Sequence, residues 1–164
     1  MKKNIYGFTL IELIVTVTII LVLTGVGTMS LNSFNGIKEL EAAREQVSNH
    51  IKLARNLAIT KQLPNEVLGL EYVRVNIANN KVTIVGVNDA GTTFNSSPYS
   101  TLSIETGKGI SVTSSSNFGF IKSTGRLTTN LGVVTNVSVV VSIVGPRGTK
   151  TININDLGII SNVN

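Results

Sequence analysis

The sequence contains no cysteine, has a single histidine, and is poor in charged residues, which make up 14% of its 164 residues. The lack of cysteine excludes disulfide bonds, thiolate catalysis and zinc–cysteine sites, so any folded domain must be stabilised by its core alone. Acidic residues after position 62 are scattered and form no recognisable catalytic pair or metal motif: Glu66, Glu71, Asp89, Glu105 and Asp156. We therefore expect no enzymatic activity, no metal site and no cofactor.

The excess of positive charge is small. The formal net charge is +5, and leaving out Lys2 and Lys3 lowers the 14 basic residues to 12, against nine acidic ones. A balance of about +3 does not by itself imply nucleic-acid binding. Four cations lie at or near expected turns and would contact phosphate if the fold gathered them at one end: Lys122, Arg126, Arg147 and Lys150. The nearby aromatic residues, Phe118 and Phe120, are too few for a base-stacking platform.

The single histidine and one acidic turn are expected to have structural rather than functional roles. His50 falls on a predicted helix, where we expect it to be a surface residue, solvated or packed. The segment Asn88-Asp89-Ala90-Gly91 offers one carboxylate and one amide, which is a poor ligand set for calcium. We expect a simple turn there.

The N-terminal region carries the most unusual pattern of the chain. Lys2 and Lys3 precede a run from Phe8 to Leu23 that is apolar at 12 of 16 positions. Continued to Leu31, the run reaches the roughly 20 residues that a membrane-spanning helix needs. The basic flank favours a cytoplasmic N-terminus and a single pass.

Glu12 is the only charged residue of this run. A carboxylate in lipid costs roughly 2.5 kcal/mol or more, so such groups are usually paired, and no basic residue lies near it in the run. Cleavage between Gly7 and Phe8 would create an amine about one helical turn from Glu12, and a neighbouring subunit would offer the same group. A carboxylate tolerated near the membrane surface is the alternative.

Residues 1–13 resemble the leader and mature start of type IV prepilins and type II secretion pseudopilins. The resemblance rests on a short basic leader ending in Gly7, on Phe8 as first mature residue, and on Glu12 as the fifth. It implies that a membrane aspartyl peptidase cuts after Gly7 and N-methylates Phe8. It further implies that Glu12 pairs with the Phe8 amine of an adjacent subunit during assembly.

The resemblance also implies a location and partners. The subunit would wait in the inner (cytoplasmic) membrane, in contact with lipid, with its C-terminal domain outside. It would then join other pilin or pseudopilin subunits in a filament with the help of an inner-membrane assembly platform. The expected divisions are a leader at 1–7, an assembly helix at 8–31, its amphipathic continuation at 32–63 and a β-rich domain at 64–164.

The continuation of the helix shows helical periodicity. Apolar residues recur at steps of three and four, with Leu53 and Leu57 widening the face, and Pro64 follows: Ile37, Leu40, Ala43, Val47, Ile51, Ala54 and Ala58. Three sites in the predicted helix have residues that weaken a helix: Gly25, Gly27 and Asn35-Gly36. They either let the helix bend during packing or allow close helix contact.

Beyond Glu66 the pattern shifts towards a period of two, which predicts strands. The expected strands are 67–77, 81–87, 101–105, 110–113, 118–122, 137–144 and 149–154, and Val137–Val144 is so apolar that both of its faces should be covered. Turns are expected at Asn79-Asn80, Thr124-Gly125 and Gly145–Gly148. A long helix packed on an antiparallel sheet gives an α+β fold.

A second resemblance concerns the GspH/FimT group of minor pseudopilins and pilins. Residues Ala54–Gln62 are similar to the end of that group's helix, and Phe118–Phe120 with Thr124–Arg126 is similar to its strand and Gly-Arg turn. The group often ends in a Gly-Arg-rich turn, whereas Asp156–Ile160 keeps Gly158 but lacks the arginine. This departure weakens a DNA-binding role carried over from competence pilins.

The expected function is that of a structural minor subunit of a type IV pilus or of a type II secretion pseudopilus. The alternatives are a minor pilin that binds DNA for uptake, a major pilin and a membrane-tethered enzyme. Identification of the mature N-terminus separates the pilin-like functions from an ordinary secretory signal, which would be cut beyond Gly27.

Overall fold

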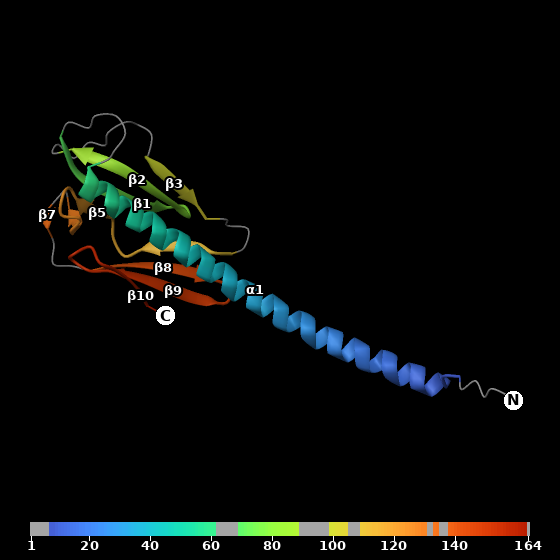
Figure 1. The fold of residues 1–164 in the computed structure, drawn as a ribbon. Coiled ribbons are helices and arrows are strands. Elements are labelled where there is room, and N and C mark those ends of the chain that lie inside the picture. The colour runs from blue at the N-terminus through green and yellow to red at the C-terminus, as the bar shows by residue number, and fades with distance from the viewer. Residues whose placement is uncertain are drawn as a thin grey trace. The chain divides into compact units, whose positions relative to one another are not determined.

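The computed structural model describes residues 7–61, 69–88, 99–104, 109–130, 133–134 and 138–163, without the side chains of residues 26–32, 130, 133–134 and 162–163. The chain divides into two compact units, Met1–Gly36 and Ile37–Asn164. One helix, α1 (Leu10–Thr60), contributes to both, so the predicted long helix is confirmed (Figure 1). It is continuous through Gly25, Gly27 and Asn35-Gly36.

In the first unit, α1 presents apolar side chains to the outside. From Phe8 to Leu23 the large apolar residues are between 48% and 79% exposed. The interspersed threonines bond within the helix: Thr16 and Thr18 donate to the carbonyls of Leu13 and Ile14 at 2.9 and 2.8 Å. Their hydroxyls are thus satisfied without solvent. Among the described residues, no helix combines the length and the mean hydropathy of a membrane span.

In the second unit, one face of α1 is buried. The covered residues follow the predicted three- and four-residue steps: Leu40, Ala43, Val47, Ile51, Ala54, Leu57 and Ala58. The sequence pattern placed Leu53 and Ile37 on this face as well, but they are 37% and 50% exposed. Leu53 lies six residues after Val47, which places it about 120° around the helix from the buried line.

The first sheet has six strands in the order β3-β2-β1-β5-β6-β7. They are β1 (Leu70–Ala78), β2 (Lys81–Asn88), β3 (Ser100–Ser103), β5 (Phe118–Ile121), β6 (Leu127–Asn130) and β7 (Val133–Val134). Neighbouring strands are antiparallel throughout. The β5–β6 connection contains the predicted turn at Thr124-Gly125.

The second sheet has four antiparallel strands in the order β10-β9-β8-β4. They are β4 (Ser111–Ser114), β8 (Val139–Gly145), β9 (Gly148–Ile154) and β10 (Ile160–Val163). Both sheets contribute to the core that covers the one buried face of α1, and in the view of Figure 1 β2 and β3 appear above the α1 segment of this unit and β8 to β10 below it. The fold class is therefore α+β, as the sequence predicted.

Each predicted strand is found in its described part, with small shifts at the ends, and the predicted residues 67–68, 105 and 137 lie outside the described residues. Strands β6, β7 and β10 were not predicted. The expectation that residues 137–144 form a strand covered on both faces was wrong. Within β8, Val139, Val141 and Ile143 are fully buried, while Val144 is 41% exposed. The strand thus packs one face on the core, as antiparallel sheets commonly do.

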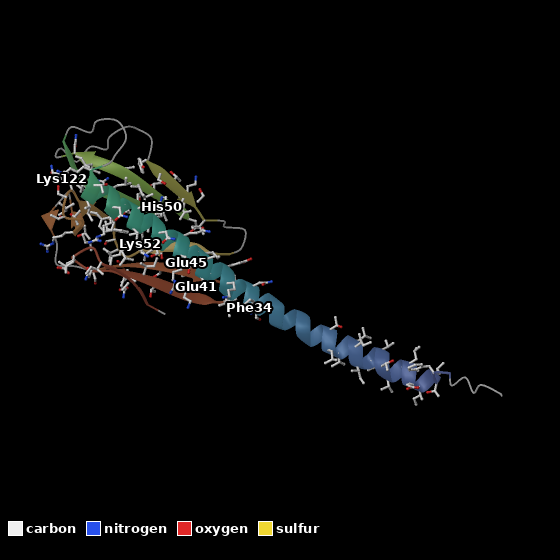
Figure 2. All side chains as sticks on the ribbon, in the orientation of Figure 1. Phe34, Glu41, Glu45, His50, Lys52 and Lys122 are labelled. Carbon is white, nitrogen blue, oxygen red and sulfur yellow. The ribbon has the colours of Figure 1, made fainter. Side chains whose placement is uncertain are left out.

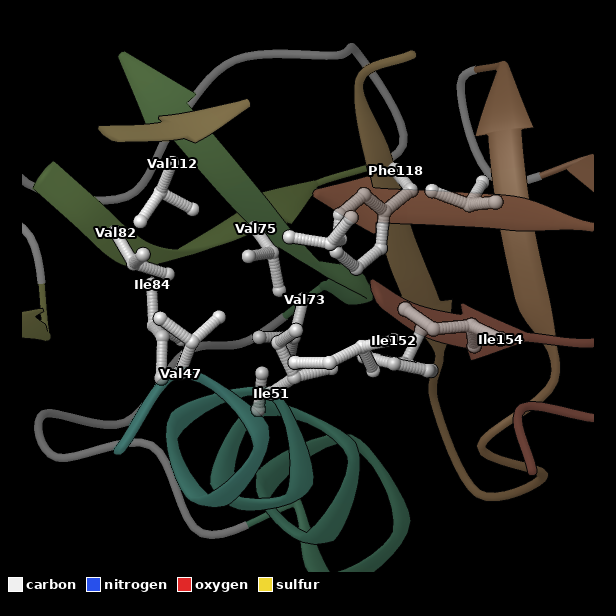
Figure 3. Close-up of a cluster of buried hydrophobic side chains, with 14 of the residues drawn as sticks. Val47, Ile51, Val73, Val75, Val82, Ile84, Val112, Phe118, Ile152 and Ile154 are labelled. Carbon is white, nitrogen blue, oxygen red and sulfur yellow. The ribbon is translucent and has the colours of Figure 1, made fainter. Parts of the chain in front are cut away.

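The core fills the space between α1 and the two sheets. Val47 and Ile51 of the helix point towards Val73 and Ile84 of the first sheet and Ile152 of the second (Figure 3). Phe118 and Phe120 meet edge to face, with ring centroids 6.1 Å apart. Every buried apolar residue of this cluster belongs to the unit Ile37–Asn164.

One turn residue joins the two sheets. Asn79 and Asn80 both have positive φ, 50° and 56°, as a two-residue hairpin turn requires. The Asn80 side-chain oxygen accepts from the Val112 amide at 3.0 Å, and its amide nitrogen donates to the Ile110 carbonyl at 3.4 Å. The hairpin of the first sheet thereby satisfies backbone groups beside β4 of the second.

Candidate functional site

The predicted cleavage position lies just outside the helix. Gly7, Phe8 and Thr9 precede α1 and adopt no regular secondary structure. Phe8 is 77% exposed, and nothing lies within 4 Å of where a side chain at Gly7 would begin. Among the described residues, nothing crowds the Gly7–Phe8 peptide bond, which is compatible with the predicted cleavage there.

Thr9 sets the start of the helix. Its hydroxyl oxygen accepts from the Glu12 amide at 3.3 Å, and its carbonyl accepts from the Leu13 amide at 3.2 Å. Thr9 is therefore the N-cap residue, and Glu12 is the third residue of the first turn. Thr-x-x-Glu is the sequence signature of a capping box, which was available in the sequence and was missed.

The position of Glu12 changes the argument about its charge. It is the acidic residue of the first turn of α1, where the helix dipole favours a carboxylate. The sequence argument treated Glu12 as lacking any favourable interaction in the uncut chain. The helix start supplies one, and a neighbouring amine would add to it.

The four candidate phosphate-binding cations lie in two places. Lys122 and Arg126 flank the β5–β6 turn, and this turn bonds to the end of the helix, where the Ser123 amide donates to the Ala58 carbonyl at 2.9 Å. Arg147 and Lys150 lie at the β8–β9 hairpin, and Lys150 Nζ is 3.8 Å from Glu41 Oε2. Glu41 and Ala58 are about 26 Å apart along α1. Figure 2 shows Glu41 and Lys122 at well-separated places along the α1 segment of this unit. The fold does not gather the four cations.

Three of these four cations also face carboxylates. Besides the Lys150–Glu41 pair, Lys122 Nζ lies 3.0 Å from Glu71 Oε2, and Arg126 Nη2 lies 3.7 Å from Asp156 Oδ2. These pairs are partly exposed, so each contributes little to stability. They nevertheless reduce the positive potential that a nucleic acid would meet.

The GspH/FimT-like segments meet at the end of the helix. Arg55 Nε donates to the Gly125 carbonyl at 3.3 Å, and Arg55 Nη2 donates to the Leu157 carbonyl at 3.4 Å. Gly158 has φ of 73°, and a side chain there would begin 2.1 Å from the Gly125 carbonyl oxygen. Arg55 thus ties two glycine turns to α1. Glycine is required at 158 by the close approach of the Gly125 backbone, and at 125 by a φ of 63° and by the Ile59 side chain, 2.8 Å from where a Cβ would lie.

The remaining polar candidates show no ligand geometry. His50 is half-buried; desolvation by burial lowers its pKa, and a backbone hydrogen bond with Ser100 acts in the opposite direction. No group of three or more potential metal-ligating side chains occurs in the described part of the chain. The turn considered for calcium, Asn88–Gly91, lies outside the described residues from 89 onward.

Comparison with protein families found a match to the prokaryotic N-terminal methylation motif over residues 2–28. Searches among curated proteins and solved structures gave no match. The matched residues include the Gly7–Phe8 junction, the Thr9 cap and Glu12. The chain therefore carries the N-terminal methylation motif of type IV pilin-like and pseudopilin precursors.

Proposed function

We propose that this chain is a structural minor subunit of a type IV pilus or type II secretion pseudopilus, of the GspH/FimT type. The observation that carries the proposal is a capped helix with exposed apolar side chains that starts immediately after an open Gly7–Phe8 junction. A helix that is apolar all round needs lipid or other such helices as its environment. The methylation motif over residues 2–28 supports the same assignment.

The proposed maturation begins with removal of residues 1–7 by a prepilin peptidase, which also methylates the Phe8 amine. Before this step the subunit waits in the inner membrane, with its N-terminus cytoplasmic and the β-rich unit outside. This placement rests on the basic leader and the apolar run 8–31. An inner-membrane platform then adds the mature subunit to a filament of other pilins or pseudopilins.

The proposed role of Glu12 is to guide that addition. A carboxylate moved among apolar helices carries a desolvation cost, and the Phe8 ammonium of a neighbouring subunit offsets it. The pair forms only at the correct axial stagger of two helices. It therefore favours ordered assembly over random aggregation of apolar segments.

The GspH/FimT assignment draws support from the junction at the end of α1. Two segments that carry this resemblance, around Arg55 and Gly125, contact each other in the fold, and the turn at Gly158, which departs from the group's pattern by lacking its arginine, packs against both. Binding of nucleic acid is not favoured, because Lys122, Arg126 and Lys150 face carboxylates and the four cations are divided between two places.

Mass spectrometry of the mature N-terminus tests the maturation directly. We expect a chain that begins at methylated Phe8 when the protein is expressed with a prepilin peptidase, and the full chain without it. A mature chain that starts at Met1, or beyond Gly27, would refute the proposal.

The Glu12→Gln variant tests assembly separately from maturation. Glutamine keeps the size and hydrogen-bonding capacity of the side chain and removes its charge. We expect normal cleavage, but incorporation into sheared filaments reduced at least about tenfold, as loss of about 1.4 kcal/mol implies. Glu45→Gln, an exposed change on the same helix, is the matched control and should assemble normally. If Glu12→Gln were incorporated into filaments as well as Glu45→Gln, the charge of Glu12 would have no role in assembly.

A further inference from the structure

A polar hollow of about 230 Å³ lies on the face of the first sheet opposite the core. In β1, Val73 and Val75 point into the core, so the alternating residues Tyr72 and Arg74 point to the other face. Arg74 pairs with Gly119 of β5, and Gly119 pairs with Thr128 of β6. Three strands thus place Arg74, Gly119 and Thr128 in one row across the sheet.

The floor of the hollow is buried and its rim is polar. Gly119 leaves the centre of the row without a side chain, and an added Cβ would lie 3.0 Å from the Tyr72 ring. Tyr72 and Thr128 are only 4% and 1% exposed. The rim consists of the half-buried Arg74 and Thr129 and the exposed Asn117. A small ligand would thus meet a buried floor and several hydrogen-bonding groups.

Arg74 is held in place by a neutral partner. Its Nη2 donates to the Tyr72 hydroxyl at 2.7 Å, and its guanidinium carbon lies 5.7 Å from the centre of the Tyr72 ring. Within the described residues no carboxylate pairs with Arg74, whereas Arg44, Lys122, Arg126 and Lys150 all have one. A guanidinium has five N–H donors, so a positioned Arg74 retains donors for a bidentate carboxylate.

We propose that this hollow binds a small hydroxylated carboxylate, of the class of a single sugar acid. Arg74 takes the carboxylate, and Asn117 and Thr129 hydrogen-bond to the adjacent hydroxyl groups. The volume falls below the roughly 300–1,000 Å³ of pockets for larger ligands, which fits one sugar ring. This binding activity goes beyond the proposed filament role and does not depend on leader cleavage.

The test is an NMR titration of the full-length, isotope-labelled chain in detergent micelles at constant ionic strength. The probes are D-glucuronate, D-glucose, acetate and inorganic phosphate, and the observed signals are the Gly119 amide and the Arg74 Nε–H. We expect saturable shifts with glucuronate, and binding at least about tenfold weaker for each of the other probes. The constant salt concentration prevents screening from being mistaken for selectivity.

Variants separate the proposed site from general charge effects. Arg74→Gln should weaken glucuronate binding at least tenfold, and Tyr72→Phe, which keeps the ring but frees the guanidinium, should weaken it severalfold. Lys81→Gln, which removes an exposed cation from β2, should bind as the unaltered chain does. Unchanged dispersion of the other amide signals verifies the fold of each variant.

Three results would overturn the proposal. Equal affinity for phosphate and glucuronate would reduce the hollow to an adventitious anion site, and equal affinity for glucose would remove the role of the carboxylate. Retention of full glucuronate binding by Arg74→Gln would also exclude this site.

Discussion

At the residue scale, the segment from Thr9 to Glu12 both starts the helix and carries the carboxylate that is proposed to guide assembly. Thr9 is the N-cap, so the helix begins after it and Gly7 and Phe8 lie outside the helix. Glu12 lies in the first turn, where its charge interacts favourably with the helix dipole. The same carboxylate that is proposed to guide assembly therefore also stabilises the helix start before assembly.

Replacing Thr9 by valine should weaken this helix start. Valine keeps the branched shape but removes the oxygen that accepts from the Glu12 amide, at a cost of about 1 kcal/mol. Hydrogen exchange of the Glu12 amide in micelles should accelerate about fivefold, the factor that corresponds to this energy. Thr9→Ser keeps the oxygen and should exchange like the unaltered chain. Equal protection in Thr9→Val would mean that the hydroxyl does not cap the helix.

His50 should make the stability of the β-rich unit depend on pH. Burial lowers its pKa in the folded state below the unfolded value of about 6.5. The unfolded chain therefore binds more protons near and below that pH, and the free energy of unfolding should fall as the pH falls from about 7.5 towards 5.5.

Urea unfolding of the full chain in micelles at several pH values measures this effect. The chain has one histidine, so the assignment is direct. In His50→Gln the free energy of unfolding should change little between about pH 7.5 and 5.5. The loss of stability below about pH 5, which protonation of carboxylates causes, should remain. A slope of the same size in His50→Gln would assign the effect to other groups.

At the element scale, the β1–β2 hairpin does more than pair two strands. Its turn residue Asn80 connects to the backbone at Ile110 and Val112 through its side chain, and its carbonyl accepts from the Ile104 amide at 2.9 Å. The Asn79-Asn80 turn, which was predicted from the local sequence alone, thus also joins the two sheets. The separate sheets gain a fixed contact at this point.

Two substitutions at Asn80 separate its roles. Asn80→Gly keeps the positive φ and loses only the side-chain hydrogen bonds, which should cost about 1–2 kcal/mol. Asn80→Ala loses the same bonds and also places a Cβ in the left-handed region, at an additional cost of about 1 kcal/mol. Midpoints of chemical unfolding measure both. If Asn80→Gly were as stable as the unaltered chain, the side-chain hydrogen bonds between the sheets would contribute nothing to the free energy of unfolding.

At the scale of the whole molecule, the two units differ in what stabilises them. The unit Ile37–Asn164 holds the entire described apolar core, whereas the first unit exposes its apolar side chains. The second unit needs no contact with the first to bury its core. The first unit requires an apolar environment from elsewhere.

We therefore expect residues 37–164 alone to fold cooperatively in water. Circular dichroism and urea unfolding should show a single transition, with a slope of about 1–3 kcal/mol per molar urea for a domain of this size. Val47→Asp within this fragment should abolish the transition, because it places an unpaired charge at a fully buried position. A fragment without a cooperative transition would show that the N-terminal segment is required for folding.

Local periodicity and turn chemistry predicted the long helix, most of its buried face and seven of the strands, because these patterns depend on near neighbours in the chain. The short strands β6, β7 and β10 escaped prediction. Their residues, such as Leu127–Asn130, carry no clear alternation and become strands only by pairing with partners distant in sequence. Leu53 was misplaced for a related reason, since the width of a buried face depends on what covers it.

The sequence by itself determined the leader pattern, the apolar run and the placement of Glu12, because each is a matter of residue types at fixed spacing. It also contained the Thr9 signature, which was readable but missed. Only the tertiary structure decided that the four candidate cations lie apart, that Arg55 meets Gly125 and Leu157, and that Arg74 has a tyrosine rather than a carboxylate beside it. These relations join residues far apart in the chain or depend on side-chain orientation, and no local pattern encodes which of them meet.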